Sequence, residues 1–245
     1  MSRLDPRLLL QGYATGIFPM ADSRVAAELF WVEPRNRAII PLDGFHMSRS
    51  LRQTLRSGRF AVTHDISFAE VINACADREE TWINDELERA MLALHSSGHA
   101  HSVEVWQGGA LVGGLYGVKL GRAFFGESMF SRATDASKVA LAWLVARLRT
   151  GNFTLLDCQF MTEHLASLGA ISVPRETYVA LLSAALGRGA SVGVPATGAL
   201  VEALGRTPEG APDFLALDRL LELAGAAGAA GPAGYVIAQL LGQTS

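Results

Sequence analysis

The alternation of apolar and polar positions predicts a run of strands in the middle of the chain. Three strand-like stretches follow one another closely, at residues 101–107, 110–120 and 122–130. The Gln-Gly-Gly between the first two is typical of a hairpin turn. After an intervening helix, the apolar run "FTLLDCQF" at 153–160 predicts one more buried strand.

Helical spacing and cap residues predict helices on both sides of this strand run. Ser67 with Glu70 matches a capping box, and Thr134 is a candidate cap for a helix with Leu141, Leu144 and Leu148 on one stripe. The predicted helices lie between Ser48 and Gly58, from Ser67, from about Asp85 to Ser97, from Thr134, over 162–170, and from about Thr177 to Leu186. A short strand is expected at 60–63.

The order of these elements predicts an α+β fold. Three consecutive strands favour an antiparallel meander, and the strand–helix–strand step after it favours one parallel neighbour. This order resembles the GNAT-like acyltransferase fold, a mixed sheet flanked by helices. We expect a small N-terminal α/β subdomain at 1–45, a GNAT-like catalytic domain at 46–186, and a Gly/Ala-rich, partly mobile extension at 187–245 with a helix near 213–224.

Composition indicates a globular protein, and the charge is uneven. Hydrophobic residues make up 49% and charged residues 18%, no apolar run reaches a membrane span, and the first residues lack a signal-peptide layout. The two cysteines, Cys75 and Cys158, lie in apolar runs, which fits reduced thiols in a cytoplasm.

Residues 1–60 carry nine arginines and five acidic residues, a net charge of +4, against −7 for the rest. This basic front either meets an anionic partner or is an ordinary solvated face. Its densest run is Arg49, Arg52, Arg56 and Arg59, of which the first three share one face of a helix.

Two polar features interrupt apolar strands and are candidates for chemistry. Glu127 lies in "FFGESMF", so it needs a charged partner, an altered pKa or water. Asp157 and Gln159 are two positions apart in "LLDCQF", so strand alternation predicts that they share one face and that Cys158 faces the other. The pair is either a rigid polar site or a buried Asp satisfied by backbone donors.

Other candidate sites are weaker. His99 and His101 alternate at a strand start, but no third ligand is near, so structural histidines are favoured over a metal site. In GNAT enzymes that use coenzyme A, the loop between the fourth strand and the next helix is usually glycine-rich, because its backbone N–H groups hold the pyrophosphate. The loop here, "SRATDASK", has no glycine, which argues against a coenzyme A donor. No other phosphate-binding glycine motif is present.

Eight motifs occur in order: "GYATGIFPM", "HMSRSLR", "TWIND", "LHSSGHAHSVEVW", "LVGGLYGV", "GESMFSRATDASKVAL", "DCQF" and "HLASLGA". Together they resemble the leucyl/phenylalanyl-tRNA–protein transferase family over residues 7–185. The resemblance implies an enzyme that moves Leu or Phe from aminoacyl-tRNA to the N-terminal Arg or Lys of a protein, creating a bacterial N-degron. It also implies a cytoplasmic monomer with no metal and no cofactor.

The resemblance also assigns residues. It places Asp157 and Gln159 on the catalytic pair, and Glu127 and Trp82 on substrate-binding positions. The positions on or near the pocket for the transferred side chain are Leu115, Phe124, Met129 and Leu156, and those expected to contact aminoacyl-tRNA are Met20 and the Phe30–Trp31 pair. Met20 replaces a frequent tryptophan and Phe30 alters a common Trp-Trp, so the preference between Leu and Phe is open.

These assignments suggest a mechanism. A carboxylate in an apolar cleft would select the cation of the acceptor. Gln159 would donate to the developing oxyanion while Asp157 orients Gln159 and the amine; alternatively, Gln159 accepts the amine proton. The rival functions are another aminoacyl-tRNA-dependent transferase, such as a longer cell-wall bridge enzyme, and a non-catalytic tRNA- or N-degron-binding module, which has no need of the Asp157–Gln159 pair.

Overall fold

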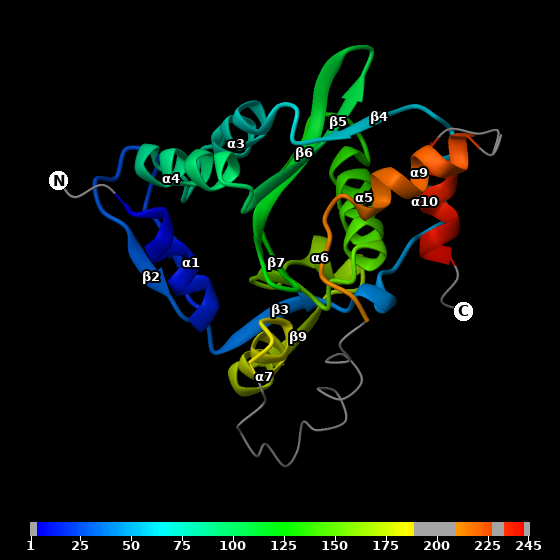
Figure 1. Cartoon of the computed structure of the whole chain (residues 1–245). Coiled ribbons are helices and arrows are strands. Elements are labelled where there is room, and N and C mark those ends of the chain that lie inside the picture. The colour runs from blue at the N-terminus through cyan, green and yellow to red at the C-terminus, as the bar shows by residue number, and fades with distance from the viewer. Residues whose placement is uncertain (1–3, 189–208, 227–232, 243–245) are drawn as a thin grey trace.

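The computed structural model describes residues 4–188, 209–226 and 233–242, and it places a seven-stranded mixed sheet between helices (Figure 1). The strands of this sheet are β3 (Asn36–Ile40), β4 (Ala61–His64), β5 (Ala100–Gln107), β6 (Ala110–Leu120), β7 (Ala123–Ser131), β8 (Leu155–Gln159) and β9 (Ile171–Pro174). Their order across the sheet is β4-β5-β6-β7-β8-β3-β9. The predicted α+β fold is confirmed.

The middle of the sheet follows the predicted topology. β5, β6 and β7 form an antiparallel meander, whose first turn uses Gly108 and Gly109 at φ 57° and 81°. β7 then pairs in parallel with β8, across a connection that contains α5 (Ala136–Thr150). β8 is antiparallel to β3, which also pairs with β9.

Helices cover both faces of the sheet, so the core has two layers. One apolar cluster packs around α5, which is almost wholly buried, and α2 (Arg49–Arg56). The other cluster involves the helices α1 (Pro6–Thr15), α3 (Phe68–Ala76), α4 (Asp85–Ser96) and α7 (Arg175–Ala185). Two short helices, η1 (Leu42–Gly44) and α6 (Glu163–Ser167), complete the central part. No helix in the described ranges is long and apolar enough to cross a membrane.

Two predicted caps are wrong in detail. The Ser67 side chain makes no cap hydrogen bond; its backbone N–H instead donates to Glu104 on β5. α5 starts after Asp135, which adopts a left-handed conformation, and not at Thr134. The first residue of α5 packs closely on the sheet, because a Cβ added to Gly113 on β6 would lie 2.5 Å from the Cβ of Ala136.

The N-terminal residues contribute to both sheets. β1 (Phe18–Met20) and β2 (Phe30–Val32) form a two-stranded antiparallel sheet. β3, which the sequence assigns to the same subdomain, lies instead between β8 and β9 in the large sheet. The division into parts stays a prediction, but the place of β3 favours a first boundary before residue 36 over one at residue 45.

The described C-terminal residues pack on the rest of the protein. α9 (Ala216–Ala226) matches the predicted helix, whereas α10 (Ala233–Gly242) was not foreseen. Phe214 is buried, and Arg147 on α5 donates to both carboxylate oxygens of Asp218 at 2.6 and 2.7 Å. Figure 1 shows α9 and α10 beside α5. Much of the Gly/Ala-rich stretch, for which mobility is predicted, lies outside the described residues.

Candidate active site

A cavity of about 210 Å³ opens where β7 and β8 stop pairing. The two strands are paired only from Ala123 to Phe125 and from Leu155 to Asp157. Beyond these residues, both strands continue as cavity walls. The cavity is lined by Arg78, Trp82, Leu115, Tyr116, Gly126, Glu127, Ser128, Met129, Leu141, Leu144, Leu156, Cys158, Gln159, Phe160, Thr162, His164 and Leu165.

Most of the residues predicted to bind the substrate meet at this cavity. Trp82, Leu115, Met129 and Leu156 reach it from a loop and three strands, beside Glu127 and Gln159, the latter predicted as catalytic. Leucines of α5 supply further apolar wall. The result is an apolar chamber with a small polar group at one side, which is the usual form of a small-ligand site.

Phe124 is an exception among the predicted pocket residues. It is fully buried and does not line the cavity. Its ring stacks on Phe214, with centroids 5.8 Å apart. Phe124 and Phe125 are adjacent on a strand and belong to opposite apolar layers, so strand alternation sends Phe124 into the core around α5.

Met20 and Trp31 also lie outside the cavity wall, on the two-stranded sheet. Trp31 packs against Gly12, where an added Cβ would come within 2.3 Å of its ring. The sheet nevertheless borders the site. The N–H of Ala21 donates to the carbonyl of Trp82 at 3.0 Å, and the ring of Phe18 meets Phe160 edge-on with centroids 5.6 Å apart.

Glu127 is the central polar group of the site. It is 5% exposed, and its Oε1 accepts a hydrogen bond from Nε2 of Gln159 at 2.9 Å. Burial raises the pKa of Glu127 to about 8; the nearby Tyr13 hydroxyl, Arg37 and Gln159 oppose the rise, while the charge of Asp157 adds to it. In the free protein Glu127 is therefore mostly protonated at pH 7.

Asp157 is held by a different set of groups. Arg37 donates to it from Nε at 2.9 and 3.1 Å and from Nη2 at 2.7 Å, and the Tyr178 hydroxyl donates at 2.7 Å. The backbone N–H of Gln159 donates at 2.8 Å. Asp157 is fully buried and is not a wall of the cavity. Asp157 therefore accepts hydrogen bonds from Arg37, from Tyr178 and from the backbone of Gln159. These contacts fix the backbone at the end of β8, next to the cavity.

The predicted alternation along β8 holds for Asp157 and Cys158, because Cys158 packs with the cluster around α5 and Asp157 contacts Tyr178 of the opposite cluster. The shared face of Asp157 and Gln159 stays a prediction. Cys158 and Gln159 both line the cavity, whereas Asp157 points into the cluster with Arg37 and Tyr178. The pairing of β8 with β3 is irregular at this point, because Ala38 opposes Gln159 and Ile39 opposes Asp157. Gln159 also has a left-handed backbone with φ 61°, which turns the chain at the end of the strand.

Several residues of the site were not foreseen from the sequence. Arg37 and Tyr178 hold Asp157, and the buried hydroxyl of Tyr13 lies near Glu127. Arg37 carried one usable signal, because an arginine directly before the apolar run "AII" needs an anionic partner if the run is buried.

Two further wall residues were missed. His164 lines the cavity, and its buried Nε2 has no hydrogen-bond partner among the described residues. Arg78 lies at the wall, donates to the Ser128 hydroxyl at 2.7 Å and stacks over the ring of Trp82. Burial raises the pKa of the Cys158 thiol well above its usual range, which disfavours the thiolate form.

His99 and His101 contact different groups. Nδ1 of His101 donates to Oδ2 of Asp65 at 2.7 Å, whereas Nδ1 of His99 lies 3.2 Å from the Ser97 hydroxyl. Within residues 4–188, 209–226 and 233–242, no cluster of His, Cys, Asp and Glu side chains has the geometry to hold a metal ion.

The predicted arginine face forms on α2. Arg49, Arg52 and Arg56 are exposed on this helix, while Leu51 and Leu55 are buried on its inner side. Arg59 follows the end of the helix, with its guanidinium 4.7 Å from the ring centroid of Phe60. The structure therefore confirms the shared face, and the role of these arginines stays a prediction.

All comparisons with known proteins indicate one family. Residues 39–183 match the family described as leucyl/phenylalanyl-tRNA protein transferase, and residues 2–35 match the N-terminal domain of that family. A leucyl/phenylalanyl-tRNA–protein transferase of Rhizorhabdus wittichii is 58% identical over the whole length of both chains. That of Zymomonas mobilis is 60% identical over 75% of this chain and 70% of its own, and that of Cereibacter sphaeroides is 62% identical over 75% and 86%.

Proposed function

This chain belongs to the leucyl/phenylalanyl-tRNA–protein transferase family and is an aminoacyltransferase, and from that premise we propose how its site works. The donor is leucyl- or phenylalanyl-tRNA, and the acceptor is a protein with an N-terminal Arg or Lys. The apolar cavity takes the transferred side chain. Glu127 takes the cation of the acceptor.

The observation that carries this proposal is the buried carboxyl of Glu127 at an apolar cavity. No cationic side chain is paired with it among the described residues, since Arg37 is engaged by Asp157. Glu127 is the only acidic residue among the described residues that line the cavity, so a guanidinium or ammonium of the acceptor would pair with it. Where water is excluded, such a charge-assisted pair is strong and selective.

Protonation of Glu127 couples to acceptor binding. With a pKa of about 8, the carboxyl is mostly neutral in the free protein at pH 7. An incoming cation favours the ionised form, so binding releases a proton. A neutral resting state also explains how a lone carboxyl is tolerated in an apolar wall, because the cost of burying a bare charge arises only when its partner arrives.

The chemical step needs little more than positioning. The acceptor amine attacks the carbonyl carbon of the aminoacyl ester; the new amide bond forms, the bond to the ribose oxygen breaks, and the amine proton ends on the ribose hydroxyl. An α-amine ordinarily titrates at about pH 7.7–8.0, so roughly a tenth to a fifth of it is neutral at pH 7 and a strong base is unnecessary. Holding the two groups in line can supply about 7–11 kcal/mol.

Gln159 is the catalytic residue in this scheme. One N–H of its amide is held by Glu127, which fixes the orientation of the side chain. The other N–H is then available to the oxyanion that forms during attack. This role is preferred over acceptance of the amine proton, because amides are poor bases. Asp157 acts as a positioning residue, since it accepts from the backbone N–H of Gln159 and not from its side-chain amide.

The remaining expectations are proposals of the same kind. Arg49, Arg52, Arg56 and Arg59 contact tRNA phosphates, and the protein acts as a cytoplasmic monomer without metal or cofactor. The N-terminal sheet with Met20 and Trp31 contacts the aminoacyl-tRNA end, which fits its position beside Phe160 and Trp82.

One experiment tests the proposal. The protein is incubated with radiolabelled leucyl-tRNA and peptides that begin with Arg, Lys or Ala, and the label in the peptide is measured. We expect transfer to the Arg and Lys peptides only. Binding of tRNA and peptide without transfer would identify a non-catalytic binding module, and transfer to Ala peptides at the same rate would remove the role of Glu127.

A further inference from the structure

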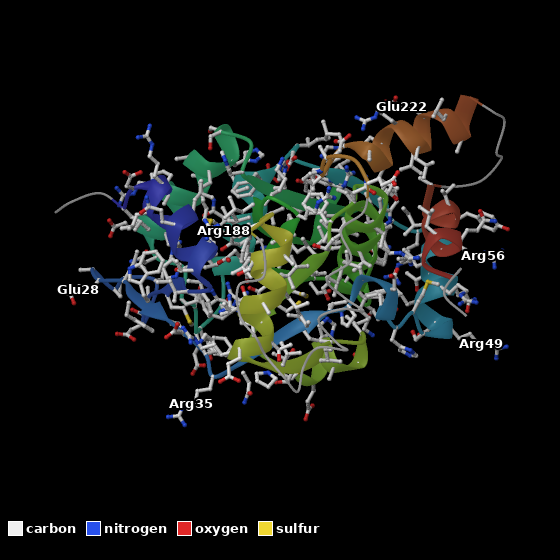
Figure 2. All side chains as sticks on the ribbon, turned by 60° about the horizontal axis from the view of Figure 1, so that its bottom comes forward. Glu28, Arg35, Arg49, Arg56, Arg188 and Glu222 are labelled. Carbon is white, nitrogen blue, oxygen red and sulfur yellow. The ribbon has the colours of Figure 1, made fainter. Side chains whose placement is uncertain are left out.

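A second cavity, of about 380 Å³, lies between α2 and the C-terminal helix α10. It is lined by Arg52, Arg56, Tyr235, Ala238, Gln239 and Gly242. α10 is outside the stretches that match the family and its N-terminal domain, which end at residue 183. Figure 2 shows Arg49 and Arg56 projecting outward beside this helix.

α10 is fixed in this position by well-packed contacts. Ile237 and Leu241 are buried in the core cluster around α5. The backbones of the two helices also touch, because a Cβ added to Gly234 would lie 2.1 Å from the carbonyl oxygen of Leu55. Only glycine allows this approach, so the wall that α10 presents to Arg52 and Arg56 is part of the folded structure.

The charged side chains that line this cavity are both arginines, Arg52 and Arg56. Among the described residues, no carboxylate lies within salt-bridge distance of Arg49, Arg52, Arg56 or Arg59. The sequence of α10, "AGYVIAQLLG", holds no acidic or basic side chain. It offers the Gln239 amide and the ring of Tyr235, over which the Arg56 guanidinium lies at 4.5 Å from the centroid.

Aromatic stacking holds Arg56 without using its hydrogen-bond donors. The combination of uncompensated guanidinium groups with a neutral amide donor suits an anion with several oxygens. α2 is eight residues long, so its arginines form a row over roughly 12 Å. Such a row fits consecutive phosphates of a polyanion better than a single ion.

We propose that α10 and α2 together form a binding site for the phosphate backbone of the tRNA donor, in which the C-terminal helix positions Arg56 and adds Gln239. This inference rests on the proposed function. It assigns a role to α10, which lies beyond residues 39–183, the stretch matched to the family as a whole. Phosphate contacts of this kind release counterions, so they contribute affinity that falls with salt.

Gln239 is the position for the test, because its side chain is exposed and lines the cavity. Gln239→Glu should raise the Kd for leucyl-tRNA roughly tenfold at about 0.15 M salt, and Gln239→Lys should lower it and steepen the salt dependence by about one unit. The matched controls Gln107→Glu and Gln107→Lys, at an exposed position of the β5–β6 hairpin, should keep the wild-type Kd and slope.

A second pair of variants tests the proposal independently if the Gln239 variants do not fold. Tyr235→Ala should weaken tRNA binding, and Tyr235→Phe should not, because the ring beneath Arg56 is kept. Melting temperatures identify variants that do not fold. Wild-type Kd and salt slope in folded Gln239→Glu and Tyr235→Ala proteins would overturn the proposal. So would binding of inorganic phosphate that Gln239→Glu abolishes while tRNA binding stays at the wild-type level.

Direct binding separates this proposal from the proposed function. A wild-type protein that binds tRNA through α10 but transfers no leucine would disprove the function and support the site. Normal leucine transfer and normal tRNA binding in every α10 variant would support the function and disprove the site. Leucyl-adenosine, a donor without the tRNA backbone, gives a further check: the transfer defect of Gln239→Glu should be several-fold smaller with it than with leucyl-tRNA.

Discussion

Gln159 donates from Nε2 to Oε1 of Glu127 at 2.9 Å, across the gap where β7 and β8 separate. This bond joins the residue proposed to stabilise the transition state to the residue proposed to select the acceptor. The two functions are therefore not independent, because the presence of the acceptor cation changes the charge of the group that orients the amide.

Glu127→Gln should impair the use of cationic acceptors. The variant keeps the shape of the side chain and removes the charge that the cation would restore. Loss of a hydrogen bond to a charged group costs about 1.5–3 kcal/mol, so KM for Arg and Lys peptides should rise roughly ten- to a hundredfold. KM for leucyl-tRNA should stay near the wild-type value. An equal loss with a neutral N-terminal residue would show that Glu127 has no selective role.

The pKa of Glu127 predicts a pH dependence of stability. The unfolded carboxyl has its ordinary value of 4.5, whereas the folded one is raised to about 8. Between these values the folded state binds more protons than the unfolded state, so the free energy of unfolding falls as pH rises. The fall should be on the order of a few kcal/mol between pH 5 and 8. Denaturant titrations of wild type and Glu127→Gln measure it; the difference between the two proteins should follow this trend, and parallel profiles would contradict the raised pKa.

Gln159 should matter for rate and little for stability. Gln159→Ala should lower the transfer rate by roughly 10²–10³, as loss of an oxyanion donor does in other enzymes. Gln159→Gly is the informative companion, because glycine accepts the left-handed backbone at this position without strain. It should fold at least as well as Gln159→Ala and be equally slow. A folded Gln159→Gly protein that transfers leucine at the wild-type rate would assign the residue a purely structural role.

Asp157 and Arg37 should behave as a buried pair. The sequence suggests that Asp157 acts as one unit with Gln159, whereas the contacts link it to Arg37 at 2.7 Å. Removing one partner of such a pair costs about 3–5 kcal/mol. Asp157→Asn and Arg37→Met should each lower the melting temperature strongly, and the double variant should lose less than the sum of the two. Strict additivity in this cycle would mean that the ion pair contributes nothing to folding.

Binding of tRNA should depend on salt through the arginines of α2. Arg49→Ala and Arg52→Ala should each reduce the slope of log Kd against log salt by about one unit and affect different tRNA sequences alike. Arg89→Ala, a control on α4, should leave the slope unchanged. A flat salt dependence of the wild-type protein would exclude a phosphate-binding role for this face.

The pattern of the sequence by itself determined the order of the elements from α2 to α6 and the topology of the middle of the sheet, from β5 to β8. Strand and helix periods depend on neighbours within a few residues, so the meander, the parallel step to β8 and the arginine face of α2 are legible along the chain. The same holds for the burial of Glu127, which follows from the apolar residues around it.

Only the tertiary structure decided which polar residues of the site contact one another. Arg37 and Asp157 are 120 positions apart and meet because β3 and β8 are neighbours in the sheet. The irregular register between these two strands at Ala38 and Ile39 also depends on their pairing. The docking of α10 on α2 depends likewise on a backbone contact between distant segments. Long-range pairing leaves no periodic trace in the sequence, because each partner satisfies only its own local rules.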